Sequence, residues 1–305
     1  MRHHYSQRFD TTWILASICC LLSAEGGFPP AISASDVPRI TQRARSLQPG
    51  EVVQLTLTSP EPLESAQAEA FGRKFPFYSE GNPKIWRALI GIDLETKPGA
   101  NTVNVRAVTL LKTSILLKHP LSVRSKVFPT RHLSVDEKFV NPPPEVSDRI
   151  KRESQHVSEI VSTVTPVRLW EGAFDPPVPG PPISSFGKRS ILNGQARSPH
   201  AGTDFEGSTG TPIKAPNRGR VVLAAELYYS GNTVILDHGL GLYSYFGHLS
   251  RIEVTEGEVV PAGRVVGEVG ATGRVTGPHL HWSVRLSETR VDPLSLMAVL
   301  AQPHP

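Results

Sequence analysis

Alternation of apolar and polar side chains is the clearest pattern in the last third of the chain, and it predicts a strand. From residue 279 onward the two kinds of residue alternate with a period of two, the repeat of a strand with one buried face. The buried set is Leu280, Trp282, Val284 and Leu286. The opposite face carries His279 and His281, so two imidazoles are predicted to point at one place.

Short β-rich runs fill two longer stretches. In the first, residues 44–127, the runs are 52–57, 85–94, 102–108 and 114–117, separated by turns that contain Pro, Gly or Asn. This spacing predicts a β-sandwich-like accessory domain. In residues 183–295 nearly every junction between apolar runs holds Gly or Pro, which predicts an antiparallel β-sheet domain with a groove. The expected fold class is therefore mainly β.

One segment has a helical repeat. Apolar residues recur at helical spacing at Val146, Ile150, Val157, Ile160, Val161 and Val164. Pro144 suits the first turn of such a helix, and Pro166 suits a stop just past its end. We expect one amphipathic helix at about 145–164, within a linker over 128–182, and a C-terminal tail at 296–305.

The N-terminus has the order of a secretory signal. Arg2 and Arg8 precede an apolar run from Trp13 to Leu22, which is followed by Ser23-Ala24. The run is too short to span a bilayer, so we expect a signal peptide at 1–24 and no lasting membrane span. A flexible lead is expected at 25–43. Both cysteines fall inside the signal, so the mature chain is predicted to lack disulfides and to be periplasmic or secreted.

Charge narrows the choice of partners. The formal net charge is +4 and the sequence pI is about 9.1, a mild basic excess. No basic run has the length expected for a nucleic-acid surface, so no nucleic-acid partner is predicted. The basic residues at 43–45 and 151–152 are interpreted as solvated surface.

The histidine pair suits a transition metal, because neutral histidine is a preferred zinc ligand. Further donors lie upstream: His200 and Asp204 in HAGTD, where Gly202 frees the backbone, and His248 in YSYFGHL. Spacing leaves open which of His279 and His281 would hold the metal. The remaining histidines are interpreted as surface, core or turn residues: His3, His4, His119, His132, His156, His238 and His304. Of these, His238 is assigned to a hairpin turn.

Four motifs, HAGTD, GNTVILDHG, YSYFGHL and GATGRVTGPHLHW, together resemble the lysostaphin/LytM-type zinc metallopeptidases, which hydrolyse peptide bonds in bacterial peptidoglycan. The resemblance covers about residues 182–293. It implies that His200, Asp204 and His281 are ligands of one Zn²⁺, and that His248 and His279 are catalytic. Three protein ligands would leave a fourth zinc position for water, as in catalytic sites.

The resemblance implies a zinc endopeptidase acting on peptidoglycan peptides, with a Gram-negative periplasmic cross-link enzyme favoured. The bond cleaved stays open among glycine bridges, D-alanyl cross-links and host proteins. One alternative is a metal-free, wall-binding regulator of another hydrolase. A cupin-like metal enzyme is disfavoured, because the only later histidine is His304. Four nearby residues are left outside the site: Arg189, Asn193, Tyr243 and Tyr245.

Overall fold

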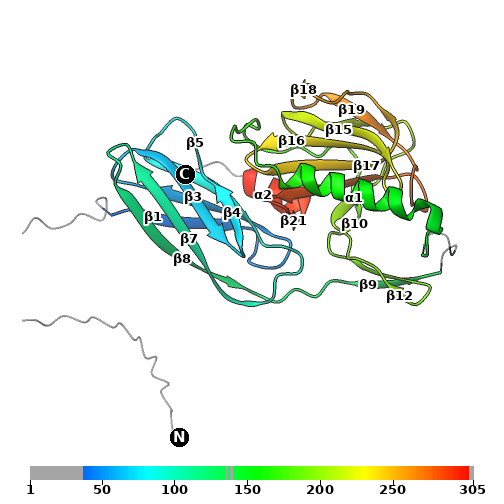
Figure 1. The fold of residues 1–305 in the computed structure, drawn as a ribbon, viewed down its shortest axis with the longest axis horizontal. Helices are drawn as coiled ribbons and strands as arrows, with labels where there is room; N and C mark the ends of the chain where they lie inside the picture. The colour runs from blue at the N-terminus through cyan, green and yellow to red at the C-terminus, as the bar shows by residue number, and fades with distance from the viewer. Residues whose placement is uncertain (1–36, 135–136, 138–139, 302–305) are drawn as a thin grey trace, which may run out of the picture.

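A computed structural model describes residues 37–134, residue 137 and residues 140–301 of the 305-residue chain. Two β-rich bodies lie side by side, with the longer helix drawn across the C-terminal one (Figure 1). The predicted signal peptide, residues 1–24, lies outside the described residues. In the part that is described, no helix is both long and apolar enough to cross a membrane.

The N-terminal body consists of two four-stranded antiparallel sheets. One has the strand order β1-β2-β6-β5 and the other β4-β3-β7-β8. The strands are β1 (Arg39–Ala44), β2 (Val52–Thr58), β3 (Leu63–Ala70), β4 (Arg73–Pro76), β5 (Tyr78–Ser79), β6 (Ile85–Gly91), β7 (Gly99–Thr109) and β8 (Ser114–Val123). Along β7, Val103, Val105 and Ala107 are buried in the core, while Asn104 and Arg106, which alternate with them, are exposed. The predicted sandwich and the mainly β fold are confirmed.

Two parts of this body differ from the prediction. Residues 39–43, assigned to a flexible lead, belong to β1, whose six residues all pair with β2. The segment is polar because β1 is an edge strand, so the sequence shows no apolar run there. Strand β3 also carried no signal, since its sequence LESAQAEA consists mostly of residues that are depleted in strands. Pairing with β4 and β7 on either side overrides that preference.

The C-terminal body is built on one ten-stranded sheet, whose main path is β10-β13-β20-β17-β16-β15-β18. Its strands are β10 (Pro182–Ser184), β13 (Gly202–Phe205), β14 (Pro212–Lys214), β15 (Gly219–Leu227), β16 (Gly231–Gly239), β17 (Leu242–Ile252), β18 (Val259–Val260), β19 (Val265–Val269), β20 (Leu280–Leu286) and β21 (Thr289–Val291). All pairs in this sheet are antiparallel. The four apolar residues predicted to be buried on β20 are at most 2% exposed.

A third, smaller sheet joins the linker segment to the C-terminal body. Strand β9 (Thr130–Leu133) pairs in parallel with β11 (Arg189–Leu192), which in turn pairs with β12 (Gln195–Ala196). The chain that leaves the first body therefore becomes part of the second, just upstream of residue 200. Residues 130–133 were assigned to the linker, because these short strands have no alternating pattern in the sequence.

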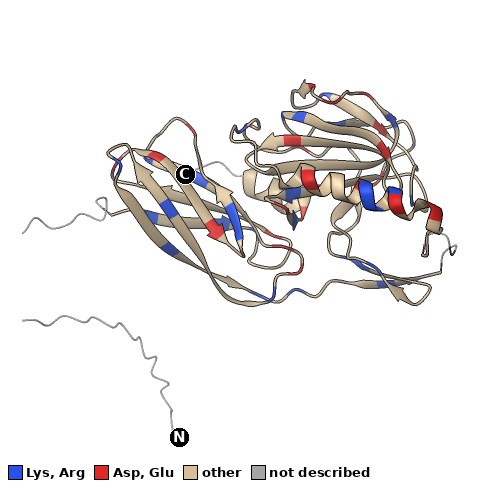
Figure 2. Ribbon diagram, in the orientation of Figure 1, with Lys and Arg blue, Asp and Glu red and all other residues tan. Residues whose placement is uncertain are grey.

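The predicted helix is present as α1 (Ser147–Ser162), preceded by a 3₁₀ turn at Pro144–Val146. Its apolar stripe, with Val157, Ile160 and Val161, packs against side chains of β15, β16 and β17. Charged residues of both signs lie along the side of α1 turned to the viewer (Figure 2). The helix is thus amphipathic, as its pattern predicted.

A second helix, α2 (Pro293–Leu300), occupies residues that were assigned partly to a C-terminal tail. Asp292 caps it by accepting a hydrogen bond from the Leu294 backbone N, and Pro293 occupies the first turn. Leu296 and Val299 are buried. The helix has only eight residues, too few for its periodicity to be recognised in the sequence.

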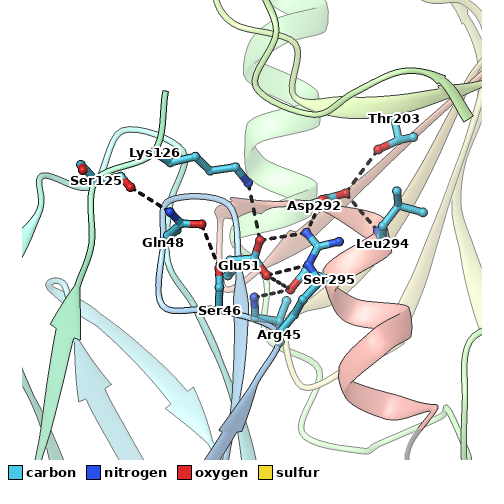
Figure 3. A network of polar contacts seen from close by, with 11 residues as sticks. Arg45, Ser46, Gln48, Glu51, Ser125, Lys126, Thr203, Asp292, Leu294 and Ser295 are labelled. Atoms are coloured by element: carbon cyan, nitrogen blue, oxygen red, sulfur yellow. Dashed lines mark hydrogen bonds and ion pairs between the residues drawn. The ribbon is translucent and has the colours of Figure 1, made fainter. Parts of the chain in front are cut away.

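Polar contacts join the two bodies around Arg45 (Figure 3). Its guanidinium donates to Glu51 at 2.8 Å and to Asp292 of the C-terminal body at 2.6 Å. Ser295 of α2 also donates to Glu51, at 2.8 Å. Burial lowers the pKa of Arg45, but the two carboxylates outweigh burial and raise it above its ordinary value. Arg45 lies at the surface, as predicted, with 38% of its side chain exposed, but it also bridges two carboxylates, which the sequence did not indicate.

Candidate metal centre

Three of the predicted residues converge on one point. Asp204 on β13 stands opposite His281 on β20 in the strand register, and His200 lies in the segment that leads into β13. Asp204 Oδ1 is 2.9 Å from His200 Nε2 and 2.9 Å from His281 Nδ1. The two imidazole nitrogens are 3.0 Å apart. Among the described residues, this is the one group of His, Cys, Asp and Glu close enough to hold a metal ion.

Gly202 allows this close approach because of space. A Cβ atom at this position would lie 2.5 Å from the Trp282 carbonyl oxygen and 2.7 Å from the His281 ring. The sequence prediction attributed the role of Gly202 to backbone freedom, but its φ lies outside the left-handed region. Strands β13 and β20 can therefore bring Asp204 and His281 together only with a glycine here.

The donor set fits a zinc ion. Zinc accepts imidazole nitrogen and carboxylate oxygen at about 2.0–2.2 Å, so ligand atoms of a tetrahedral site lie about 3.3 Å apart. The three atoms here are slightly closer, at 2.9–3.0 Å. His200 Nδ1 is 3.1 Å from the Ser185 carbonyl oxygen, a bond that orients the ring and leaves Nε2 as the donor atom.

The pKa shifts of Asp204 and His281 favour the protonation states that metal binding requires. Burial raises the pKa of Asp204, but hydrogen bonds from His200 and His281 outweigh burial and hold it well below its ordinary range. Burial also lowers the pKa of His281, which favours the neutral imidazole. A carboxylate with neutral imidazole is the form that binds metal.

His248 and His279 stand beside the three converging side chains. Their ring centroids are 5.0 Å apart, and His279 Nε2 is 3.8 Å from Asp204 Oδ1. His248 Nδ1 is 2.9 Å from the Thr272 carbonyl oxygen, and His279 Nδ1 is 2.9 Å from that of Gly277. An Nδ1–H group that donates to a carbonyl leaves Nε2 with its lone pair on both rings. Both rings are thus oriented to exchange a proton through Nε2.

The His248 backbone is unusual, because its φ of 69° lies in the left-handed region. A residue with a Cβ adopts this conformation at a cost of about 1–2 kcal/mol, and such strain gathers at functional sites. Burial, together with the charges of neighbouring histidines, lowers the pKa of His248 to about 3. The ring is therefore neutral at pH 7.

The residues left out of the site lie around it. Tyr245 sits with its ring centroid 6.4 Å from that of His281, and its hydroxyl donates to Ser230 Oγ at 2.5 Å. Tyr243 is buried and bonds to the Thr163 carbonyl. Arg189 lies on β11, and the Asn193 side chain is bonded to Glu137. The supports missed by sequence reasoning are backbone carbonyls, such as that of Thr272, which no residue type reveals.

His238 belongs to the core and lies on β16, so its assignment to a turn was wrong. The two-residue turn follows at Leu240 and Gly241, both with positive φ, as a tight hairpin requires. His238 Nδ1 is 2.8 Å from the Arg218 carbonyl oxygen, and Nε2 is 2.9 Å from Ser244 Oγ. The ring is fully buried and does not join the converging group.

Comparison with known proteins agrees with this geometry. Residues 198–293 match peptidase family M23. The crystal structure of a putative peptidase M23 from Pseudomonas aeruginosa is 35% identical and has a TM-score of 0.66. That alignment covers 85% of this chain and 97% of the other. The chain belongs to peptidase family M23. The predicted resemblance is thereby confirmed.

Curated relatives within the M23 region carry more specific names. Peptidoglycan DD-endopeptidase ShyA of Vibrio cholerae is 44% identical over 87 residues, which is 28% of this chain and 20% of that protein. DD-carboxypeptidase/endopeptidase Mpg of Neisseria meningitidis is 38% identical over 97 residues, which is 32% of this chain and 22% of that protein. The chain thus covers only about a fifth of the length of these relatives.

Proposed function

We propose that this M23 protein is a zinc-dependent endopeptidase that hydrolyses peptide bonds of bacterial peptidoglycan. The observation that carries the proposal is the convergence of His200, Asp204 and His281 within 3.0 Å of one another, with two further histidines beside them. Relatives named peptidoglycan DD-endopeptidases support the substrate class.

Three side chains would hold the ion: His200 through Nε2, Asp204 through Oδ1 and His281 through Nδ1. A site with three protein ligands retains an open position, which distinguishes catalytic zinc sites from structural ones. When bound, zinc would lower the pKa of water to about 7 and polarise the substrate carbonyl.

His248 and His279 would move the protons. One of them accepts the proton of the attacking water at Nε2 and passes it to the leaving amine. The other, as an imidazolium that has taken a proton from solvent at Nε2, would donate a hydrogen bond to the oxyanion that develops on the substrate carbonyl. Because their Nδ1 atoms are bonded to the backbone carbonyls of Thr272 and Gly277, neither ring needs to reorient during this exchange.

The proposed scissile bond is a peptide bond in a cross-link or a stem peptide of the wall. The proposed site of action is the Gram-negative periplasm. Two observations support this setting: the signal-like residues 1–24 and the relatives from Vibrio cholerae and Neisseria meningitidis. A metal-free regulator would not need the five side chains, and all five are present in the site.

The deciding experiment is mass spectrometry of fragments released from purified murein by the zinc-loaded protein. We expect cross-linked dimers to be converted to monomers with one new amine and one new carboxylate. Release should stop with a chelator and return when zinc is added. If metal analysis shows the protein to be loaded with zinc and the murein dimers still remain intact, the endopeptidase proposal is ruled out and the regulator is favoured.

A further inference from the structure

The turn at residues 228–231, between β15 and β16, is bonded to both segments that carry the candidate catalytic histidines. The Ser230 carbonyl accepts a hydrogen bond from the His248 backbone N at 2.7 Å. The Tyr229 carbonyl accepts one from the Arg274 backbone N at 2.8 Å, in the loop that leads to His279. The Arg274 guanidinium also lies over the Tyr229 ring, 4.4 Å from its centroid.

Thr272 links the residue just after the turn to the His248 ring. Thr272 accepts a hydrogen bond from the Asn232 backbone N at its hydroxyl, at 2.9 Å, and its carbonyl lies 2.9 Å from His248 Nδ1. The His248 backbone is held in the left-handed region, a conformation that persists only when the surroundings fix it. Its two fixed points are the carbonyls of Ser230 and Thr272. The direction of the His248 ring therefore depends on the placement of the turn.

Helix α1 contacts this turn through the Glu153 carboxylate and through Arg149, whose guanidinium lies 5.9 Å from the Tyr228 ring centroid. Glu153 Oε2 accepts a hydrogen bond from the Tyr228 backbone N at 2.7 Å. Its other oxygen, Oε1, accepts from Arg149 Nε at 2.6 Å, so the carboxylate itself is oriented. The Glu153 side chain is only 20% exposed. A hydrogen bond to a shielded, charged acceptor is worth about twice a neutral one.

We propose that Glu153 is a positioning residue for the reaction: from the connecting helix it fixes the 228–231 turn and thereby sets His248 and the loop before His279. The inference rests on the proposed roles of these two histidines. Helix α1, which the sequence presents as a linker, becomes part of the catalytic unit. Glu153 contacts neither substrate nor metal in this scheme and acts only through the turn.

The test compares Glu153→Ala, Glu153→Gln and Glu159→Ala in the full chain loaded with zinc. Glutamine keeps an acceptor oxygen for the Tyr228 N–H, whereas alanine removes it. Glu159 lies on the same helix, and its carboxylate contacts Gln155 on that helix. We expect Glu153→Ala to lower kcat about tenfold with KM and zinc content unchanged, because small displacements of catalytic groups are costly. Glu153→Gln should stay within about threefold of the parent.

A second readout does not depend on turnover. Amide hydrogen exchange at His248 and Arg274 should become faster in Glu153→Ala and remain at the parent rate in Glu159→Ala. The proposal would be overturned if Glu153→Ala had the same kcat and the same exchange rates as the parent. It would also be overturned if Glu159→Ala lost as much kcat as Glu153→Ala. If the parent itself cleaves nothing, the proposed function fails, while the exchange data still show whether Glu153 holds the turn.

Discussion

At the scale of single residues, the site depends on which nitrogen of each histidine faces the centre. His200 turns Nε2 inward because its Nδ1 is bonded to the Ser185 carbonyl, whereas His281 reaches Asp204 with Nδ1. His248 and His279 both engage Nδ1 with backbone carbonyls and leave Nε2 free. The five side chains thus separate into three that converge and two that stand beside them. The proposed roles of ligand and proton carrier follow this division.

This division leads to a prediction for paired variants. Asp204→Ala removes one of three converging donors, so we expect it to lose zinc and hydrolysis together. His248→Ala leaves all three donors in place, so zinc should stay bound while kcat falls about 10²–10⁴-fold, the usual share of general acid–base catalysis. Metal analysis and murein cleavage on the same samples check both. Parent-rate cleavage by His248→Ala would show that the role assigned to His248 is wrong.

A second residue-scale prediction concerns pH and His238, which lies outside the candidate site. Burial lowers its pKa in the folded protein to about 4, against about 6.5 when unfolded. Between these values the unfolded chain binds a proton that the folded protein does not. The unfolding free energy should therefore be highest above pH 6.5 and fall as the pH drops to 4, with up to about 3 kcal/mol from this residue.

The measurement is denaturant unfolding between pH 4 and 7.5 for the parent, His238→Gln and His156→Gln. Glutamine can bond to the Arg218 carbonyl and to Ser244 without titrating, so His238→Gln should have a visibly shallower pH dependence. His156 is exposed on α1, and its replacement should leave the parent's slope unchanged. Identical slopes for the parent and His238→Gln would contradict the assignment.

At the scale of elements, the sequence identified those whose pattern is local. The alternation on β20 and the helical stripe of α1 are visible within one segment, and both predictions were confirmed. Strand β1 and strand β3 were missed because their stability comes from neighbours distant in sequence. The place of His238 on a strand and the bridging role of Arg45 were missed for the same reason, since their environments are built by other elements.

Strand β13 gives the element-scale prediction. Gly202→Ala places a Cβ 2.5 Å from a backbone oxygen of β20, so the two strands must separate. We expect zinc affinity to fall at least about tenfold, because Asp204 and His281 would be drawn apart. Gly207→Ala is the matched control: the atoms nearest to its Cβ would be those of the Val269 side chain, at 3.0 Å or more. Equal zinc affinity in both variants would show that the spacing of β13 and β20 is not decisive.

At the scale of the whole molecule, the two bodies share a continuous apolar core, which includes Val52 of β2 and Leu296 of α2. The network around Arg45 lies at the same junction, and it reaches β13, a strand of the candidate metal centre. Asp292 accepts hydrogen bonds from Arg45 and, at 3.3 Å, from the Thr203 hydroxyl, next to Asp204 in sequence. The N-terminal sandwich is therefore docked on the C-terminal body by side chains that β13, the strand of Asp204, also uses.

Replacing Arg45 tests whether the docking of the sandwich supports the candidate metal centre. Arg45→Ala would leave the carboxylates of Glu51 and Asp292, only 3% and 9% exposed, without their shared cation. A fully buried pair broken in this way costs about 3–5 kcal/mol, but the Arg45 side chain is 38% exposed, so we expect a loss of about 2 kcal/mol. Because both bodies share the junction, unfolding should remain one transition at a lower denaturant midpoint. Lysine keeps the charge but not the planar guanidinium that reaches both carboxylates, so the stability of Arg45→Lys should lie between those of Arg45→Ala and the parent.

The measurement is chemical unfolding followed at two probes. Trp86 reports on the N-terminal body and Trp282 on the C-terminal body. Two separate transitions in the parent would show that the bodies fold independently and that the sandwich does not support strand β13.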